Sequence, residues 1–256
     1  MMNRDEIKML LDVAVEKLNN KNFIASDPIS IPHQFNKKQD IEIAGLFAAT
    51  FAWGNRTTII NKSNELMQLM NNEPHEFILH HTDKDLKRMN CFVHRTFNTT
   101  DLLYFISALQ RLLIKHNSLE NIFIKHSIKN KFNIEQGLKD FYLEFFDDEF
   151  VPQRTRKHIS TPDKKSACKR LCMYLRWMVR DDKKVDFGIW KQIKAKDLIC
   201  PLDVHVSNIA RKLDLINRPQ NDWQTAVELT AILKQFDAND PVKYDFALFG
   251  MGVNNN

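Results

Sequence analysis

Residues 166–180 read SACKRLCMYLRWMVR, and this stretch has the spacing of a helix with two unlike faces. Apolar side chains recur three and four positions apart, which places them on one stripe of a helix. That stripe consists of Cys168, Leu171, Cys172, Leu175, Met178 and Val179. The remaining faces carry Lys169, Arg170, Met173, Arg176 and Arg180. We therefore predict a helix that is half core and half cationic.

The rest of the chain also has helical periodicity. Only 6 glycines and 8 prolines occur in 256 residues, which argues against a sheet protein with many tight turns. Residues 4–19 and 133–146 have apolar stripes at helical spacing. Residues 41–53, IEIAGLFAATFAW, are apolar nearly all round, as in a central buried helix. The sequence predicts an all-α fold.

The length of the chain suggests its organisation. A chain of 256 residues is somewhat long for one domain and too short for two large ones. We expect one compact unit over residues 1–256, built as two helical lobes with a groove between them. One lobe would comprise residues 39–150, and the other residues 1–38 with 151–256.

A basic segment precedes the amphipathic helix. From Gln153 to Lys169 the chain reads QRTRKHISTPDKKSACK, with the single acid Asp163. The chain's net charge of +5 is mild, so the position of these cations matters more than their total. The segment suits either phosphate contact or a solvated loop. The candidate phosphate contacts are Arg154, Arg156, Lys164, Lys165, Ser166 and Arg170.

Two further stretches combine polar residues with expected helix ends. In PLDVHV, residues 201–206, Asp203 is well placed as the N-cap of a helix, and His205 lies in its first turn. We assign His205 to phosphate contact. In the second stretch, Trp53-Gly54-Asn55-Arg56 breaks one helix, and Thr57 or Thr58 is expected to cap the next.

The order of these pieces resembles the helix-hairpin-helix DNA glycosylases, most closely the 8-oxoguanine branch. The matching pieces are a basic hairpin, a cationic helix with a lysine in its first turn, and PLDVHV at a helix start. They cover residues 39–70 and 160–252. The stretches SACKR, LRWMVR, PLDVHV and DPVKYDFALFG also resemble a bacterial family of unassigned function.

The glycosylase resemblance implies an activity and a partner. It implies Lys169 as the nucleophile of a base-excision glycosylase with AP-lyase activity, and Asp203 as the assisting carboxylate. It also implies that Trp53, Asn55 and Arg56 form the tip of a loop that enters the minor groove. The implied partner is duplex DNA with a damaged base, whose target nucleotide is flipped out of the stack.

The chain also departs from that pattern. The expected hairpin, residues 161–166, contains no glycine. Lys169 and Asp203 lie 203 − 169 = 34 positions apart, so we expect an insertion to loop out between Asp181 and Asp197. The 4 cysteines lack the four-cysteine iron–sulfur motif of the endonuclease III branch. We expect reduced thiols, no cofactor and no metal.

Two alternative functions remain open. The first is a helix-hairpin-helix-like DNA-binding protein without catalysis, and the second is an RNA-acting or nucleotide-acting enzyme on the same scaffold. For each function we expect a monomer. We also expect no membrane contact, because no apolar run approaches the roughly 20 residues of a membrane span. The expected compartment is the cytoplasm, with nucleoid association on DNA.

Overall fold

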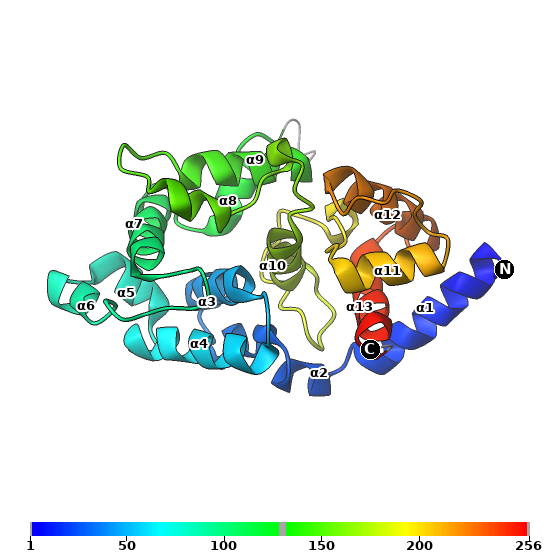
Figure 1. Ribbon diagram of the computed structural model, residues 1–256, viewed down its shortest axis with the longest axis horizontal. Helices are drawn as coiled ribbons and strands as arrows, with labels where there is room; N and C mark the ends of the chain where they lie inside the picture. Colours follow the sequence, from blue (N-terminus) through cyan, green and yellow to red (C-terminus); the bar gives the residue numbers. More distant parts are fainter. Residues whose placement is uncertain (1, 128–131, 255–256) are drawn as a thin grey trace. The chain divides into compact units, whose positions relative to one another are not determined.

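The computed structural model describes residues 2–127 and 132–254, which form two compact units (Figure 1). The terminal unit comprises Met1–Ala25 and Thr161–Asn256, and the middle unit comprises Ser26–Ser160. These boundaries differ from those expected, because residues 26–38 and 151–160 belong to the middle unit. Residues 1, 128–131, 255 and 256, which the expected lobes include, lie outside the described residues.

The described residues are mostly helical, which confirms the all-α class. No β-strand is found within 2–127 and 132–254, where pairing is limited to the isolated bridges His94–Phe97 and Ser166–Asp222. In the same residues, no helix combines the length and the apolar character that a membrane crossing requires.

The middle unit is built around α3 (Lys38–Phe51), whose residues from Asp40 to Phe51 are all buried. The prediction of a central buried helix is therefore confirmed. A cluster of phenylalanines continues this core, with ring centroids of Phe47 and Phe105 6.0 Å apart. The other helices of this unit are α4 (Arg56–Leu69), α5 (Pro74–His80), α6 (Asp83–Lys87), α7 (Thr99–His116), α8 (Leu119–Phe123) and α9 (Ile134–Phe145), with the short helices η1 (Pro28–Ser30), η2 (Pro32–Gln34) and η3 (Gln153–Lys157).

Asparagines cap α4 and α7, so the threonine cap predicted for α4 was wrong. Asn55 accepts a hydrogen bond from the Thr58 N–H at the start of α4. Asn98 caps α7 and forms a reciprocal capping box with Asp101. Asparagine fits both positions because its side-chain oxygen reaches the N–H three residues ahead.

The terminal unit is organised around α13 (Tyr244–Asn254), which packs against both α1 (Arg4–Leu18) and α11 (Val204–Lys212) (Figure 1). Gly252 permits the contact with α11, because a Cβ there would lie 2.9 Å from the His205 carbonyl oxygen. The other elements of this unit are α2 (Lys21–Ala25), η4 (Pro162–Lys164), α10 (Lys169–Val179), η5 (Ala195–Asp197), α12 (Trp223–Phe236) and η6 (Pro241–Lys243).

The stretch after α10 does not loop out, contrary to our expectation. The N–H groups of Phe187 and Trp190 donate to the carbonyls of Trp177 and Met178, at 2.8 and 2.9 Å. Val185, Trp190 and Ile193 are buried. The segment therefore folds back along α10 and contributes to the core of the terminal unit.

Candidate lysine–aspartate site

The terminal unit brings Lys169 and Asp203 together across 34 positions of sequence. Lys169 Nζ lies 3.8 Å from Asp203 Oδ2, and the two side chains are 25% and 22% exposed. Each residue stands at a helix start, Lys169 in the first turn of α10 and Asp203 at the N-cap of α11. A partly exposed amine and carboxylate at this separation can exchange a proton with a bound ligand after a small adjustment.

A glycine-free turn leads the chain into α10. Lys165 and Cys168 both adopt left-handed backbone conformations, with φ of 58° and 51°. Ser166 Oγ accepts a hydrogen bond from the Cys168 N–H at 3.1 Å. Two ordinary residues thus take the backbone positions that glycine favours. Lys164 and Lys165 are exposed on this turn.

The carboxylate of Asp203 has two separate roles in the structure. Its Oδ1 accepts a hydrogen bond from the Val206 N–H at 3.0 Å, which caps α11 as predicted. Its Oδ2 faces Lys169. The helix N-terminus also favours a negative charge at this position. His205 follows, half-buried, with its ring edge-on to Phe249 at 6.0 Å.

The surroundings of Lys169 come mainly from α13 and α10. Its Nζ lies 3.5 Å from Met173 Sδ and 5.9 Å from the centre of the Phe249 ring. Asp245 is buried in the first turn of α13, where burial raises its pKa to about 6 against the opposing charges of Arg176 and Lys169. The site thus has one partly exposed carboxylate and one buried carboxylate.

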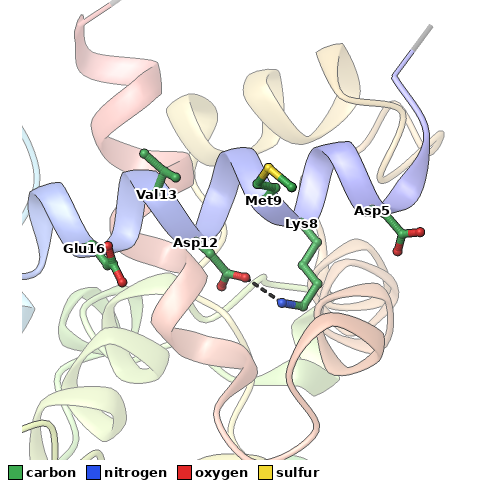
Figure 2. Close-up of a pocket in the computed structure, with 6 residues that line it drawn as sticks. All are labelled: Asp5, Lys8, Met9, Asp12, Val13 and Glu16. Atoms are coloured by element: carbon green, nitrogen blue, oxygen red, sulfur yellow. Dashed lines mark hydrogen bonds and ion pairs between the residues drawn. The ribbon is translucent and has the colours of Figure 1, made fainter.

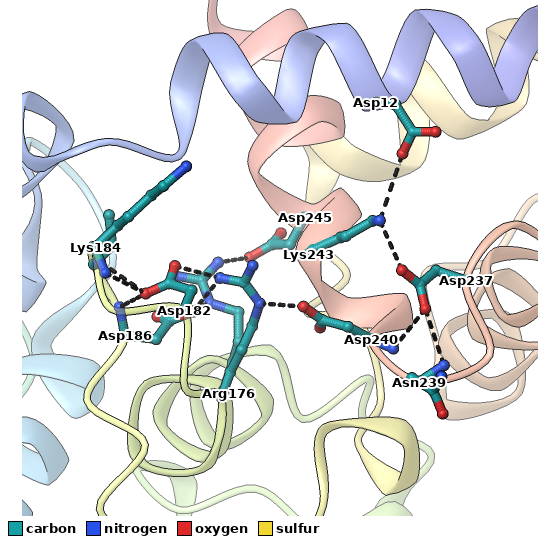
Figure 3. Close-up of polar contacts among 12 residues, drawn as sticks. Asp12, Arg176, Asp182, Lys184, Asp186, Asp237, Asn239, Asp240, Lys243 and Asp245 are labelled. Atoms are coloured by element: carbon teal, nitrogen blue, oxygen red, sulfur yellow. Dashed lines mark hydrogen bonds and ion pairs between the residues drawn. The ribbon is translucent and has the colours of Figure 1, made fainter.

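Arg176 and Arg180, expected on the cationic side of α10, are buried at 3% and 5% exposure. Both guanidinium groups are paired with carboxylates, and Figure 3 shows Arg176 among these acids. Arg176 contacts Asp245 and lies 3.3 Å from Asp186. Arg180 lies 2.6–3.0 Å from Asp182, Asp186 and Asp240. The expectation of exposure was wrong because periodicity alone cannot show that the insertion and α13 supply acids on this side.

Burial and charge act in opposite directions on the pKa values of this network. Burial lowers the pKa of Arg180, but Asp186, Asp240 and Asp182 outweigh it and raise that pKa. Burial raises the pKa of Asp186 to about 6, although both arginines oppose the shift. Arg170, half-buried in the first turn of α10, has its pKa lowered to about 10 by burial.

The predicted DNA contacts fall into two sets. Lys164, Lys165, Ser166, Arg170 and His205 lie in the terminal unit with Lys169 and Asp203. The other set lies in the middle unit and consists of Trp53, Asn55, Arg56, Arg154 and Arg156. Arg154 and Arg156 were expected in the hairpin lobe, and this assignment is corrected.

The middle-unit set lies on η3 and on the α3–α4 loop. Trp53 is half-buried against His94, with ring centroids 4.9 Å apart. Arg154 donates to the Thr96 carbonyl at 2.9 Å, and the Arg156 guanidinium lies 5.0 Å from the centre of the Phe146 ring. Asn55 is exposed and Arg56 begins α4.

Sequence reasoning missed the acids behind the site, Asp186 and Asp245. The signal was present in DPVKYDFALFGMG, where Asp245 stands among apolar residues at helical spacing. A charge inside an apolar stripe indicates a buried partner. Around Asp186 the apolar residues have no helical spacing, because the segment is irregular.

The surface pocket on α1 is not lined by the predicted site residues, and the described residues contain no metal-binding group. A shallow surface pocket lies along the outer face of α1, lined by Asp5, Lys8, Met9, Asp12, Val13 and Glu16 (Figure 2). None of the predicted site residues lines it. Within residues 2–127 and 132–254, no group of three His, Cys, Asp or Glu residues is arranged to hold a metal ion.

These observations define an all-helical protein with a lysine–aspartate pair at the starts of two helices. Residues 27–254 match a family described as a protein of unknown function, DUF2400, and the chain belongs to that family. Neither a curated protein nor a solved structure matches the chain.

Proposed function

We propose that this protein is a DNA-repair base-excision glycosylase with AP-lyase activity, and that Lys169 and Asp203 carry the chemistry. The observation that supports the proposal is the 3.8 Å separation of Lys169 Nζ and Asp203 Oδ2 at two helix starts. A lysine amine is a nucleophile able to form a Schiff base, and a carboxylate beside it can stabilise positive charge on a sugar.

The chemistry divides between the two side chains. The Lys169 ammonium first gives a proton to water, which leaves Asp203 ionised, and the neutral amine then attacks C1′ of a flipped nucleotide. The bond from C1′ to the base breaks, and the departing base takes up a proton. Opening of the sugar ring then yields an imine between Nζ and C1′, from which the 3′ phosphate can leave by β-elimination. The Asp203 carboxylate would stabilise the cationic sugar during base departure.

The polar groups around the pair suit a DNA ligand. We assign phosphate contact to Lys164, Lys165, Ser166, Arg170 and His205. The exposed turn at Lys164 and Lys165 leads directly to Lys169, so a strand held there would run past the reactive amine. In the middle unit, we assign DNA contact to Trp53, Asn55, Arg56, Arg154 and Arg156.

Borohydride trapping tests the proposal. The protein is incubated with duplex oligonucleotides, each bearing one damaged base or an abasic site, and the imine is reduced to a stable covalent adduct. We expect an adduct with the wild type and none with Lys169→Gln. Lys212→Gln, an exposed lysine of α11 outside the assigned contacts, is the matched control and should retain the adduct. An equal yield of adduct from Lys169→Gln would contradict the role of this lysine.

The principal alternative is a DNA-binding protein without catalysis. It is favoured by the glycine-free turn and by the engagement of Lys169 with Asp203 in an ion pair. This alternative predicts binding of duplex DNA with no adduct on any lesion. An RNA-acting enzyme predicts instead that structured RNA competes better than duplex DNA.

A further inference from the structure

Three segments of the middle unit converge on one aromatic cluster. They are residues 52–58, 93–98 and 151–158. The ring of Trp53 lies 4.9 Å from His94 and 6.0 Å from His158, and the rings of Phe97 and His158 are 4.9 Å apart. We call the region formed by these three segments the Trp53 surface. Its members come from separate parts of the chain, so only folding assembles it.

The Trp53 surface is strongly basic. Its three segments contain no Asp or Glu and have five cations, Arg56, Arg95, Arg154, Arg156 and Lys157. Arg154 lies 3.3 Å from Asp101, whose side chain is 0% exposed. Asp101 also accepts a hydrogen bond from Thr155 Oγ1 at 2.8 Å. Asp101 therefore anchors η3 from its buried side, while Arg95 and Lys157 are exposed.

The side chain of Arg95 packs against Gly54 within this surface. Gly54 has φ of +103°, and a Cβ built on it would fall 2.0 Å from Arg95 Nη1. The guanidinium of Arg95 therefore lies directly against the glycine backbone. Arg95 itself is exposed and adopts a left-handed conformation, with φ of 54°. A left-handed arginine is uncommon and costs conformational energy, which points to a use for its position.

Trp53 is placed differently from the other tryptophans. The chain has four, and Trp177, Trp190 and Trp223 are buried at 0%, 1% and 7% exposure. Trp53 is only half-buried and sits beside exposed Asn55. Burial lowers the pKa of the neighbouring His94, which favours the neutral form of its ring. A half-buried indole that packs on two histidine rings, in a group of segments with five cations, is a combination suited to unpaired nucleotides.

We propose that the Trp53 surface binds an unpaired nucleotide within a DNA strand. Arg95 and Arg154 would hold the flanking phosphates, and the indole of Trp53 would stack on the base. The inference adds Arg95 and the η3 arginines to one surface with Trp53. It rests on the proposed function only in taking DNA as the ligand.

Fluorescence titration of the full chain tests this surface. The probes are a duplex with one unpaired nucleotide and the same duplex fully paired, both without damaged bases. We expect tighter binding of the first probe, with quenching that Trp53→Phe largely removes, because the other tryptophans are buried. Arg95→Ala should weaken binding about tenfold and lower the log–log salt slope by about one. The charge control is Lys84→Ala on α6, which should change neither value.

Gly54→Ala provides a second variant. Its Cβ would displace the Arg95 guanidinium, so it should weaken binding as Arg95→Ala does, and the double variant should be no weaker than Arg95→Ala. Circular dichroism establishes that each variant is folded. Affinity of Arg95→Ala equal to that of Lys84→Ala would overturn the inference. Better competition by single-stranded RNA than by the same DNA sequence would overturn the choice of DNA.

The outcome is separable from that of the proposed function. In Arg95→Ala, borohydride trapping at Lys169 can still be measured on damaged duplex, provided that the duplex is present at saturating concentration. Binding through Arg95 without any adduct would contradict the glycosylase and retain the surface. If Arg95→Ala forms the adduct and binds DNA with undiminished affinity, the glycosylase proposal is retained and the Trp53 surface is contradicted.

Discussion

At the scale of single residues, the two oxygens of Asp203 separate stability from chemistry. Oδ1 caps α11 through the Val206 N–H, while Oδ2 faces Lys169. An amide side chain can retain the first contact, because its oxygen still accepts the backbone hydrogen bond. It cannot supply the negative charge of the second. One substitution therefore distinguishes the two roles.

Asp203→Asn should lower the free energy of unfolding by less than about 1 kcal/mol while reducing base excision by orders of magnitude. Denaturant unfolding and single-turnover excision are the two measurements. The matched control is Asp222→Asn, the same change at the N-cap of α12, where the side chain accepts from the Thr225 N–H. Excision by Asp203→Asn at the wild-type rate would reduce Asp203 to a cap and remove it from the mechanism.

At the scale of elements, the turn before α10 shows how the chain forms a hairpin without glycine. Lys165 and Cys168 both have positive φ, and Ser166 supports the turn by accepting the Cys168 N–H. The turn keeps its shape at a conformational cost, since each of these residues carries a Cβ in the left-handed region. In return, Lys165 presents a cation at a position where glycine has none.

Lys165→Gly should raise the free energy of unfolding by roughly 0.5–1 kcal/mol, because glycine adopts the left-handed region without strain. Lys164→Gly is the control, since Lys164 lies within η4, which ends before the left-handed position. That variant should be neutral or destabilised. Chemical denaturation of both variants measures the difference, and equal destabilisation would contradict strain at Lys165.

The turn at Lys164 and Lys165 also allows a prediction of how DNA affinity depends on salt concentration. If Lys164 and Lys165 contact phosphates, affinity for undamaged duplex should fall steeply with salt, and the double alanine variant should flatten the log–log slope by about two. Fluorescence anisotropy over a salt series measures the slope. Lys183→Ala with Lys184→Ala, two exposed lysines outside the turn, is the charge-matched control. A slope unchanged by the turn variant would remove this segment from the interface.

At the scale of the whole molecule, buried ion pairs connect the elements of the terminal unit (Figure 3). Arg176 of α10 and Arg180 at its C-cap both pair with Asp186 of the segment after α10, and Arg176 also pairs with Asp245 of α13. Farther out, Lys243 lies 3.5 Å from Asp12 of α1 and 2.7 Å from Asp237. Removing one member of such a network leaves its partners charged without compensation, which costs more than the pair contributes.

Arg176→Met should lower the free energy of unfolding by about 3–5 kcal/mol near neutral pH. The pKa values of Asp186 and Asp245 are already raised to about 6, so their favourable contribution is present at low pH and lost as the pH rises through 6. Without Arg176 both pKa values should rise further. The loss should therefore be smaller at about pH 5 than at about pH 7.5.

Denaturant unfolding at the two pH values measures this difference. Lys212→Met, which changes an exposed cation of α11, is the control and should cost little at either pH. A loss for Arg176→Met that is the same at both pH values would contradict the assignment of raised pKa values to Asp186 and Asp245.

Helix identity was largely readable from local pattern, because an amphipathic stripe and a cap depend on neighbours within four residues. The stripe of α10, the buried α3, the extent of α1 and the cap at Asp203 were all predicted in this way. The buried cysteines on α10 followed from the same stripe. The threonine cap of α4 was predicted wrongly, since Asn55 lies two or three positions before Thr57 and Thr58 and caps the helix instead.

The sequence by itself determined an all-helical chain, the helix starts at Lys169 and Asp203, and the basic character of the segment before α10. Only the tertiary structure decided that these two residues lie 3.8 Å apart, that Arg176 and Arg180 are buried, and that Arg154 lies in the same unit as Trp53. The physical reason is that a charged side chain on a helix is stable either in water or among buried carboxylates. Helical spacing is the same in both cases, and the choice depends on acids that the chain supplies from distant positions.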